Sequence, residues 1–176
     1  MKKGFTVIEI VITIIIVSII TVPFVLFFNS FIKNYHYGKP NQVVQNVVSD
    51  AIKEIAETLV QANEILTSES ERIEFNITID GNFKNIVYEL QNGFIIRSFD
   101  SEKRYVPYYN NPNTPDDEKV FLAISFKYFD ELDNLITTPN PDKVYRIEIS
   151  IKGEPYINPG NLPSLELISS VRIRNK

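Results

Sequence analysis

Hydrophobic and polar positions divide the chain into three stretches that follow different periods. The first runs from Phe5 to Phe28 and is apolar on every side of a helix, interrupted mainly by Glu9, a few Ser and Thr residues and Pro23. A helix of this length measures about 36 Å, at about 1.5 Å per residue, which is longer than the roughly 30 Å hydrocarbon core of a bilayer. The pattern predicts a membrane-spanning helix over 5–28.

The second stretch, residues 29–67, has apolar residues at helical spacing. Apolar side chains recur every three or four positions between Val44 and Ala62, and charged or amide side chains occupy the opposite face. Such a stripe is typical of an amphipathic helix that packs on a sheet. Gly38-Lys39-Pro40 predicts a kink or short break, because proline fits poorly in a helix interior. Thr67-Ser68 is expected to end the helix.

The third stretch, residues 68–176, alternates apolar and polar positions with the period of a strand. Asp80-Gly81 and Asn92-Gly93 are hairpin signals, so three antiparallel strands are expected over about 72–99. Further strands are predicted at 120–129, 144–151 and 165–174. The proline-rich segment 100–118 is expected to be a surface loop whose tyrosines cover an edge of the sheet. The predicted fold class is therefore α+β, a long N-terminal helix packed on an antiparallel β-sheet.

Composition excludes several classes of chemistry. The chain has 176 residues, no cysteine, one histidine and a formal net charge of -4. Disulfides, thiolate metal sites and histidine-cluster sites are thereby excluded, and no phosphate loop or Ser/His/Asp set is present. The acidic loop segments 116–118 and 130–133 lack the spacing of a known calcium loop. We expect no catalytic residue, cofactor or metal, and an acidic chain is not expected to bind nucleic acid.

Glu9 is the feature that a simple anchor does not explain. A carboxylate at membrane depth costs on the order of 2.5–3.5 kcal/mol near a helix centre and less near the interface, so such residues usually have a partner. A cleaved secretory signal would have a shorter apolar core and a small-x-small site, which the end of this run lacks. Lys2 and Lys3 favour a cytoplasmic N-terminus.

The first nine residues resemble the leader of type IV pilins and pseudopilins. The segment that carries the resemblance is Lys2-Lys3-Gly4-Phe5-Thr6-Val7-Ile8-Glu9, followed by the apolar run. The resemblance implies a leader peptide at 1–4, removed by a prepilin peptidase that cuts between Gly4 and Phe5 and methylates the new amine of Phe5. It also implies that Glu9 pairs with the N-terminal amine of a neighbouring subunit during assembly. Pro23 is expected to kink or loosen the helix.

Scattered segments of the C-terminal region look like the body of J-type minor pseudopilins of type II secretion and of related minor pilins. The matching residues are Val87-Tyr88-Glu89-Leu90, Gly93, Arg97, Ser125-Phe126-Lys127-Tyr128-Phe129-Asp130 and Val171-Arg172-Ile173-Arg174-Asn175.

These resemblances imply a structural subunit of a type IV pilus, type II secretion or competence filament, and not an enzyme. The expected partners are prepilin peptidase/N-methyltransferase, other pilin or pseudopilin subunits, an inner-membrane assembly platform and the lipid bilayer. The expected location is a single-pass cell membrane protein with its C-terminal domain outside the cytoplasm, which then joins an extracellular filament. The alternatives are a monomeric membrane-anchored surface binding module, such as an adhesin or receptor, and an anchored hydrolase that uses Asp/Glu pairs.

Overall fold

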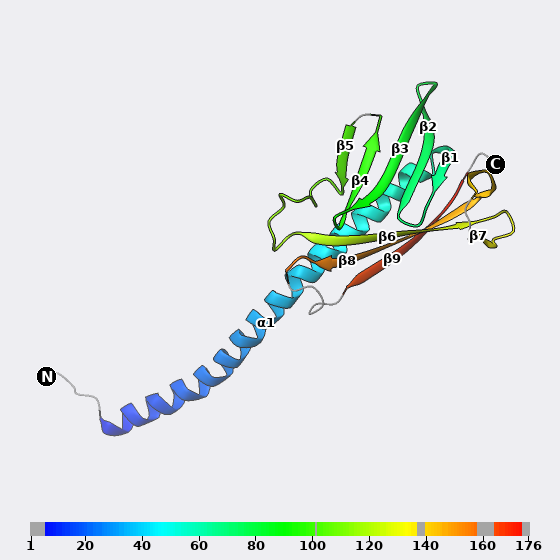
Figure 1. Cartoon of the computed structure of the whole chain (residues 1–176). Helices are drawn as coiled ribbons and strands as arrows, with labels where there is room; N and C mark the ends of the chain where they lie inside the picture. The colour runs from blue at the N-terminus through cyan, green and yellow to red at the C-terminus, as the bar shows by residue number, and fades with distance from the viewer. Residues whose placement is uncertain (1–5, 101, 137–139, 158–163, 174–176) are drawn as a thin grey trace. The chain divides into compact units, whose positions relative to one another are not determined.

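The structure is a computed structural model that describes residues 6–100, 102–136, 140–157 and 164–173. The chain divides into two units, Met1–Lys39 and Pro40–Lys176. One helix and two antiparallel sheets make up the fold, which confirms the predicted α+β class (Figure 1). The elements are α1 (Val7–Leu59), β1 (Ala62–Ser68), β2 (Arg72–Ile79), β3 (Asn82–Gln91), β4 (Phe94–Phe99), β5 (Glu102–Val106), β6 (Val120–Phe129), β7 (Leu135–Ile136), the 3-10 helix η1 (Pro141–Lys143), β8 (Arg146–Pro155) and β9 (Leu165–Arg172).

Helix α1 differs from the prediction at two places. It continues through Gly38-Lys39-Pro40, so the predicted break is not formed. It ends at Leu59, and the expectation that the amphipathic helix extends to residue 67 is wrong. Residues 62–68 pair instead with β2, which buries Ala62 and Ile65. Pairing with a neighbouring strand here outweighs the local helical period.

The strands form two sheets where the sequence predicted one. The first is a five-stranded meander in the order β1-β2-β3-β4-β5, and the second has four strands in the order β7-β6-β8-β9. The predicted three-stranded meander over 72–99 is confirmed as β2, β3 and β4, and the predicted strand at 120–129 is β6. Strand β5 lies in the segment expected to be a loop. Its first three residues, Glu102-Lys103-Arg104, are exposed and charged, so no alternation marks it as a strand.

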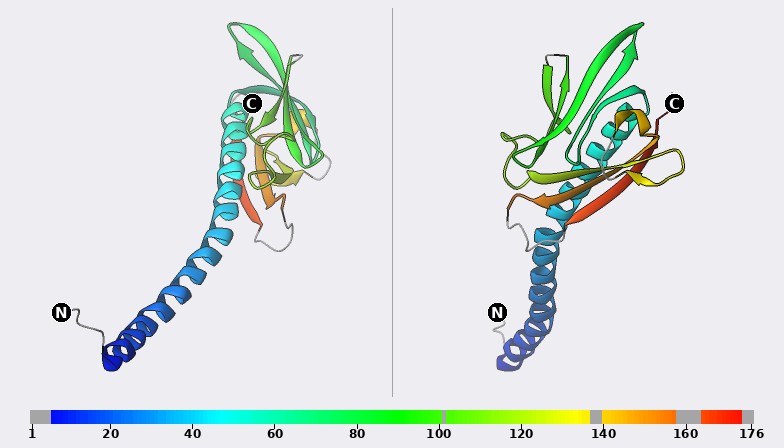
Figure 2. Two further views of the ribbon diagram at one scale, coloured as in Figure 1. Left: turned by 90° about the vertical axis from the view of Figure 1, so that its left-hand side faces the viewer. Right: turned by 45° about the vertical axis from the view of Figure 1, so that its right-hand side comes forward.

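The core lies between the second half of α1 and the two sheets, within the second unit (Figure 2). The helix contributes six side chains that are at most 1% exposed: Val44, Val47, Val48, Ala51, Ile55 and Leu59. Glycine at position 153 of β8 lets α1 pack closely on this strand, because a Cβ there would lie 2.4 Å from Val48 Cγ2. The prediction that this helical stripe packs on a sheet is confirmed.

The two sheets are joined directly through their backbones. Leu122 N of β6 donates to Gly93 O at 2.7 Å, and Phe126 N donates to Ser70 O at 2.8 Å. The loop after β5 is joined to β6 by the buried Asn110, whose amide donates to Val120 O at 2.9 Å and accepts from Val120 N at 3.0 Å. These bonds hold the sheets and the loop in one unit around the second half of α1.

Candidate functional site

The residues predicted to act in processing and assembly lie at the start of the chain. Gly4 and Phe5 are outside the described residues, so the cleavage site remains a prediction from sequence. Glu9 occupies the third position of α1, and Pro23 lies within the same helix. Glu9 is therefore the predicted assembly residue whose surroundings the structure shows.

Glu9 forms a capping box with Thr6 at the first turn of α1. The backbone N–H of Thr6 donates to Glu9 Oε2 at 2.8 Å, and the Thr6 hydroxyl donates to the same oxygen at 3.0 Å. In return, Glu9 N donates to Thr6 Oγ1 at 3.4 Å. This reciprocal pattern satisfies backbone donors that a helix N-terminus leaves without intrahelical partners. Glu9 thus has a local role in the chain that our sequence reasoning did not identify.

The signal for that role was present in the sequence. A Ser or Thr followed three residues later by Glu, just before an apolar run, marks a helix N-terminus, and Thr6-Val7-Ile8-Glu9 fits that pattern. Thr6 is therefore the residue at this site that the sequence analysis passed over. The second carboxylate oxygen of Glu9, Oε1, accepts no hydrogen bond in the described part of the chain, so it can still accept one from another group.

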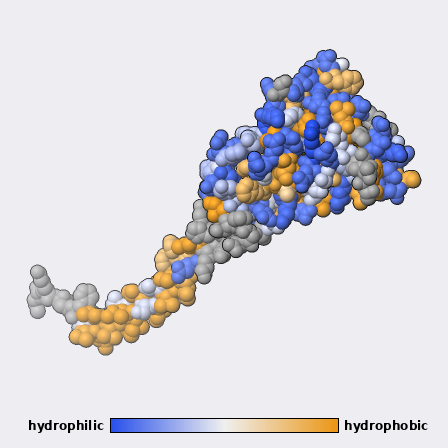
Figure 3. Space-filling model, viewed as in Figure 1, coloured by the Kyte–Doolittle hydropathy of each residue, from blue (hydrophilic) through white to orange (hydrophobic). Residues whose placement is uncertain are grey.

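The segment that follows Glu9 is apolar on all sides. Val7–Ile32 has a mean hydropathy of 3.0 and none of it is buried within the structure, so it is long and apolar enough to cross a membrane. Its hydrophobic surface is continuous over much of its length in Figure 3. A helix that is hydrophobic all round must be surrounded by lipid or by other helices. In the part of the chain that the structure describes, the side chains of residues 7–32 are all exposed.

The hydroxyl groups of residues 7–28 are satisfied by the helix itself. Thr13 donates to Glu9 O at 2.7 Å, Ser18 to Ile14 O at 2.8 Å and Thr21 to Val17 O at 2.7 Å. Each bond removes a polar donor that hydrocarbon could not solvate. Apart from Glu9, the described polar side chains of residues 7–28 are therefore suited to an apolar environment.

Pro23 is accommodated inside a continuous helix. It supplies no N–H, so the carbonyl of Ile19 loses its usual partner four residues on. The aromatic rings of Phe24 and Phe28 stack just after it, with centroids 6.2 Å apart. The kink predicted at Pro23 remains a prediction.

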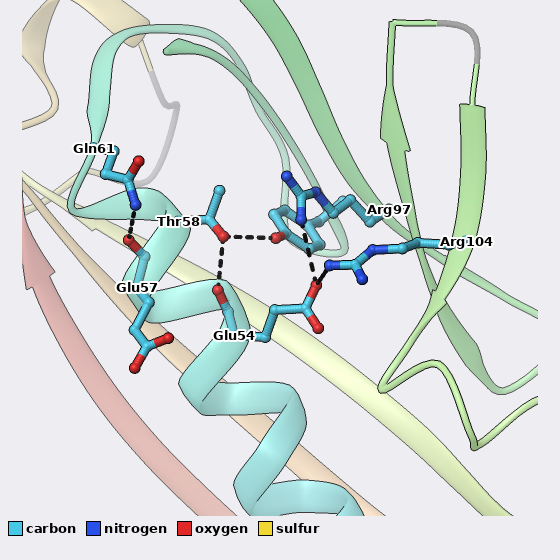
Figure 4. Close-up of polar contacts among 7 residues, drawn as sticks. Glu54, Glu57, Thr58, Gln61, Arg97 and Arg104 are labelled. Carbon is cyan, nitrogen blue, oxygen red and sulfur yellow. Dashed lines mark hydrogen bonds and ion pairs between the residues drawn. The ribbon is translucent and has the colours of Figure 1, made fainter. Parts of the chain in front are cut away.

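A second polar cluster joins α1 to the five-stranded sheet. Glu54 Oε1 accepts from Arg104 Nη2 at 2.5 Å and lies 3.6 Å from Arg97 Nη1, as Figure 4 shows. One turn further along, the Thr58 hydroxyl accepts a hydrogen bond from Tyr88 at 3.1 Å. Burial is the main cause that raises the pKa of Tyr88 to about 12. These contacts fix the helix on β3, β4 and β5, and we assign them a structural role.

The acidic loop segments have local roles in the residues that the structure describes. Asp130 Oδ1 accepts from the backbone of Leu132 at 2.9 Å and of Asn134 at 2.8 Å, and the hydrogen bonds from Asn134 are the main cause that lowers the pKa of Asp130. Asp116 pairs with Lys119 at 2.7 Å. In the described ranges, no three His, Cys, Asp or Glu residues come together as a metal site.

Comparison with known proteins adds no identification. No protein-family model matches this sequence, and no curated protein matches it significantly. The described architecture, a long apolar N-terminal helix followed by antiparallel β-sheets, is compatible with that of pilins. The start of α1 is the site on which a functional argument can be built.

Proposed function

We propose that this chain is a minor pilin or pseudopilin, a structural subunit of a type IV pilus, type II secretion or competence filament. The observation that carries the proposal is the carboxylate of Glu9 at the first turn of an apolar helix that has no covering side chains in the described chain. Together with the sequence around Gly4 and Phe5, it supports cleavage before Phe5 and assembly through the helix. Residues 7–32 act first as the membrane anchor and then as the packing surface.

The pairing of charges explains why an acid is useful here. Cleavage before Phe5 produces a positive α-amine next to an apolar segment, and Glu9 of a neighbouring subunit is its counter-charge. Each charge alone is costly in a low-dielectric bundle, and the attraction between them offsets much of that cost. The free Oε1 of Glu9 can accept from this amine while Oε2 keeps its bonds to Thr6. Because only one stagger brings amine to acid, the pair also sets the register between helices.

The remaining features of the proposal follow from this mode of assembly. The contact is heterologous, the kind that builds an open filament and does not close on itself. The N-terminus lies in the cytoplasm and the sheet domain outside it. The partners are the prepilin peptidase/N-methyltransferase, other pilin or pseudopilin subunits, the assembly platform and the bilayer. The chain is a substrate of an enzyme and not itself an enzyme.

Replacement of Gly4 tests the processing step. A Gly4→Leu chain should remain at precursor size on a gel, and mass spectrometry should find residues 1–4 still attached. Gly4→Ala, which adds a single methyl group, serves as the matched control and should be cut to a larger extent. A mature-sized Gly4→Leu product beginning at Phe5 would contradict the proposed cleavage site.

Replacement of Glu9 tests the assembly step. Glu9→Ala should be inserted and cleaved but should not appear in sheared filaments, which an immunoblot of the filament fraction measures. A photocrosslinking residue in place of Val11 probes the neighbours of the helix in membranes, because it can react with any adjacent subunit. It should yield a ladder of crosslinked subunits in the otherwise native chain and none with Glu9→Ala. A Glu9→Ala chain that enters filaments normally would contradict the pairing.

The capping box favours a second candidate, a monomeric membrane-anchored binding module. If closing the first turn of α1 were all that Glu9 did, the helix would need no neighbour. Such a protein would be an adhesin or receptor that carries a pilin-like leader. The photocrosslinking residue at position 11 separates the two candidates, because a monomer gives no crosslinked ladder in the otherwise native chain.

A further inference from the structure

The two sheets have four edge strands, and three of them are protected against pairing with another chain. Strand β7 has only two residues, and β5 carries the charges of Glu102, Lys103 and Arg104 along its length. Strand β1 has register shifts at 62/64 and 65/67 and lies against η1. Short length, charge, bulges and a covering element are the means by which proteins prevent edge-to-edge association.

Strand β9 carries two charged residues, Glu166 and Arg172, near its two ends and has none of the other protections. It has eight residues, contains no proline and pairs with β8 without a register shift from Leu165 to Arg172. In the ranges that the structure describes, β8 is its only neighbour in the sheet. Ile168, at the centre of the strand, is 61% exposed. A long, regular edge of this kind is a template for an added strand.

The direction of the β9 backbone groups follows from bonds elsewhere in the sheet. Leu122 and Phe126 of β6 donate their N–H groups away from β8, so even-numbered residues of β6 point away from it and odd-numbered ones towards it. The register pairs Lys127 with Glu148, and Ile149 with Ser169. Odd-numbered residues of β9 therefore bond to β8. The bond from Ile173 N to Tyr145 O, 2.9 Å long, agrees with this assignment.

The even-numbered residues of β9 consequently direct their N–H and C=O groups to the open side. These residues are Glu166, Ile168, Ser170 and Arg172. Their side chains are all exposed, and two of them are tied back to β8: Ser150 donates to Glu166 at 2.5 Å and Arg146 to Ser170 at 3.2 Å. Two side chains of the edge are thus bonded to β8, while four pairs of backbone groups face outward.

We propose that β9 is a docking edge for an antiparallel β-strand of a different subunit. The outward backbone groups require an extended partner, because only a strand presents N–H and C=O groups at matching intervals. The charges select its side chains: a basic residue opposite Glu166 and an acidic residue opposite Arg172, with an apolar residue opposite Ile168. Arg172 has no ion-pair partner among the residues described here, so its charge is available.

The choice of a different subunit over a second copy rests on the proposed function. Two copies joined through β9 in antiparallel fashion would be related by a two-fold axis, and such an isologous contact closes after two chains. A filament grows through heterologous contacts, so an edge that pairs with a different subunit fits it and a closed pair does not. The docking edge itself depends only on residues 165–172 and can be tested apart from cleavage and stem assembly.

A photocrosslinking residue in place of Ile168, in the full-length chain and in membranes of cells that normally produce it, tests the proposal. The crosslinked peptide, identified by mass spectrometry, should come from a predicted strand of another subunit. Adding Ser170→Pro should lower the yield about tenfold, because it removes an outward N–H that β8 does not use. Ser170→Ala keeps that N–H and serves as the matched control with unchanged yield.

Three results would overturn the proposal: equal yields for Ser170→Pro and Ser170→Ala, a crosslink to lipid alone, or a crosslink to a second copy of this chain. If Ser170→Pro lowers the midpoint of thermal unfolding, Arg172→Glu replaces it. That variant should reduce the yield several-fold with an unchanged midpoint, and an unchanged yield contradicts the proposal. Failure of the proposed function is recognised separately, by normal filament incorporation of Glu9→Ala.

Discussion

The two halves of α1 meet different surroundings although they belong to one helix. Val7–Ile32 is apolar on every side and wholly unburied in the described chain, whereas Val44–Leu59 has one apolar stripe that is buried against two sheets. The second half obtains its apolar contacts from its own chain. The first half must obtain them from outside, either from lipid or from other helices.

The carboxylates of the two halves differ in the same way. Glu54 in the second half has two guanidinium groups of its own chain as neighbours. Glu9 in the first half is bonded only to Thr6, and no cation lies near it among the residues described. Among the described residues, a carboxylate in an apolar segment without a counter-charge is therefore the feature for which we propose a counter-charge on another molecule. This contrast is the basis of the assembly proposal.

The largest effect that sharpens the comparison should come from equal truncations in the two halves. Ile55→Ala removes a fully buried side chain and should lower the free energy of unfolding of the sheet domain by about 2–5 kcal/mol. Ile15→Ala, at a side chain 54% exposed, should leave that free energy unchanged. Chemical denaturation of the full chain in detergent micelles measures both. Equal losses would show that the first half is also packed within its own chain.

A smaller effect is expected where the second half of α1 approaches β8. Gly153→Ala would place a methyl group 2.4 Å from Val48 Cγ2 and 3.1 Å from Val44 Cγ1, so the helix must shift. Overpacking of this kind typically costs about 1–3 kcal/mol. Gly38→Ala, where a Cβ meets nothing within 4 Å, is the matched control and should not destabilise the domain. Denaturant midpoints compare the two variants, and equal midpoints would contradict the close packing at Gly153.

The smallest effect concerns the polar contact between Tyr88 and Thr58. Tyr88→Phe should lower the free energy of unfolding by about 1 kcal/mol through loss of one hydrogen bond. Because burial raises the pKa of Tyr88 from 10.0 to about 12, its contribution is complete below pH 10 and is lost as the pH rises through 12. The loss of stability over that range should be smaller in Tyr88→Phe. Burial also raises the pKa of Tyr128, so part of the alkaline loss should remain.

Much of the fold could be predicted from the sequence where one signal dominated. The bounds of β6 agree with the prediction, and the side chains from Val120 to Phe129 alternate between buried and more exposed positions, as expected for a strand. The predicted end of α1 was wrong because the apolar residues of 62–67 have a helical spacing. Only the pairing of these residues with β2 makes them a strand. The division into two sheets depends on bonds such as Leu122 N to Gly93 O, which no local pattern indicates.

The residues of the candidate site differ in how clearly the sequence indicates them. Glu9 stands out in the sequence because it is charged in an apolar run, and its capping partner Thr6 could also have been found from the spacing. The cluster of Glu54, Arg97 and Arg104 could not, because Glu54 is 50 residues from Arg104 in the sequence and only the packing of α1 on the sheet brings it to the two arginines.

Exchange of Glu9 for Gln separates the charge of this side chain from its role in the first turn of α1. Glutamine at this position can still complete a capping box with Thr6, but it carries no charge to pair with an amine. The amounts of native chain, Glu9→Gln and Glu9→Ala in sheared filaments, relative to mature protein in the membrane, separate the two roles. If the charge of Glu9 is needed for pairing, Glu9→Gln should be excluded from filaments as fully as Glu9→Ala. Incorporation of Glu9→Gln at the native level would show that the carboxylate serves only the first turn of its own helix.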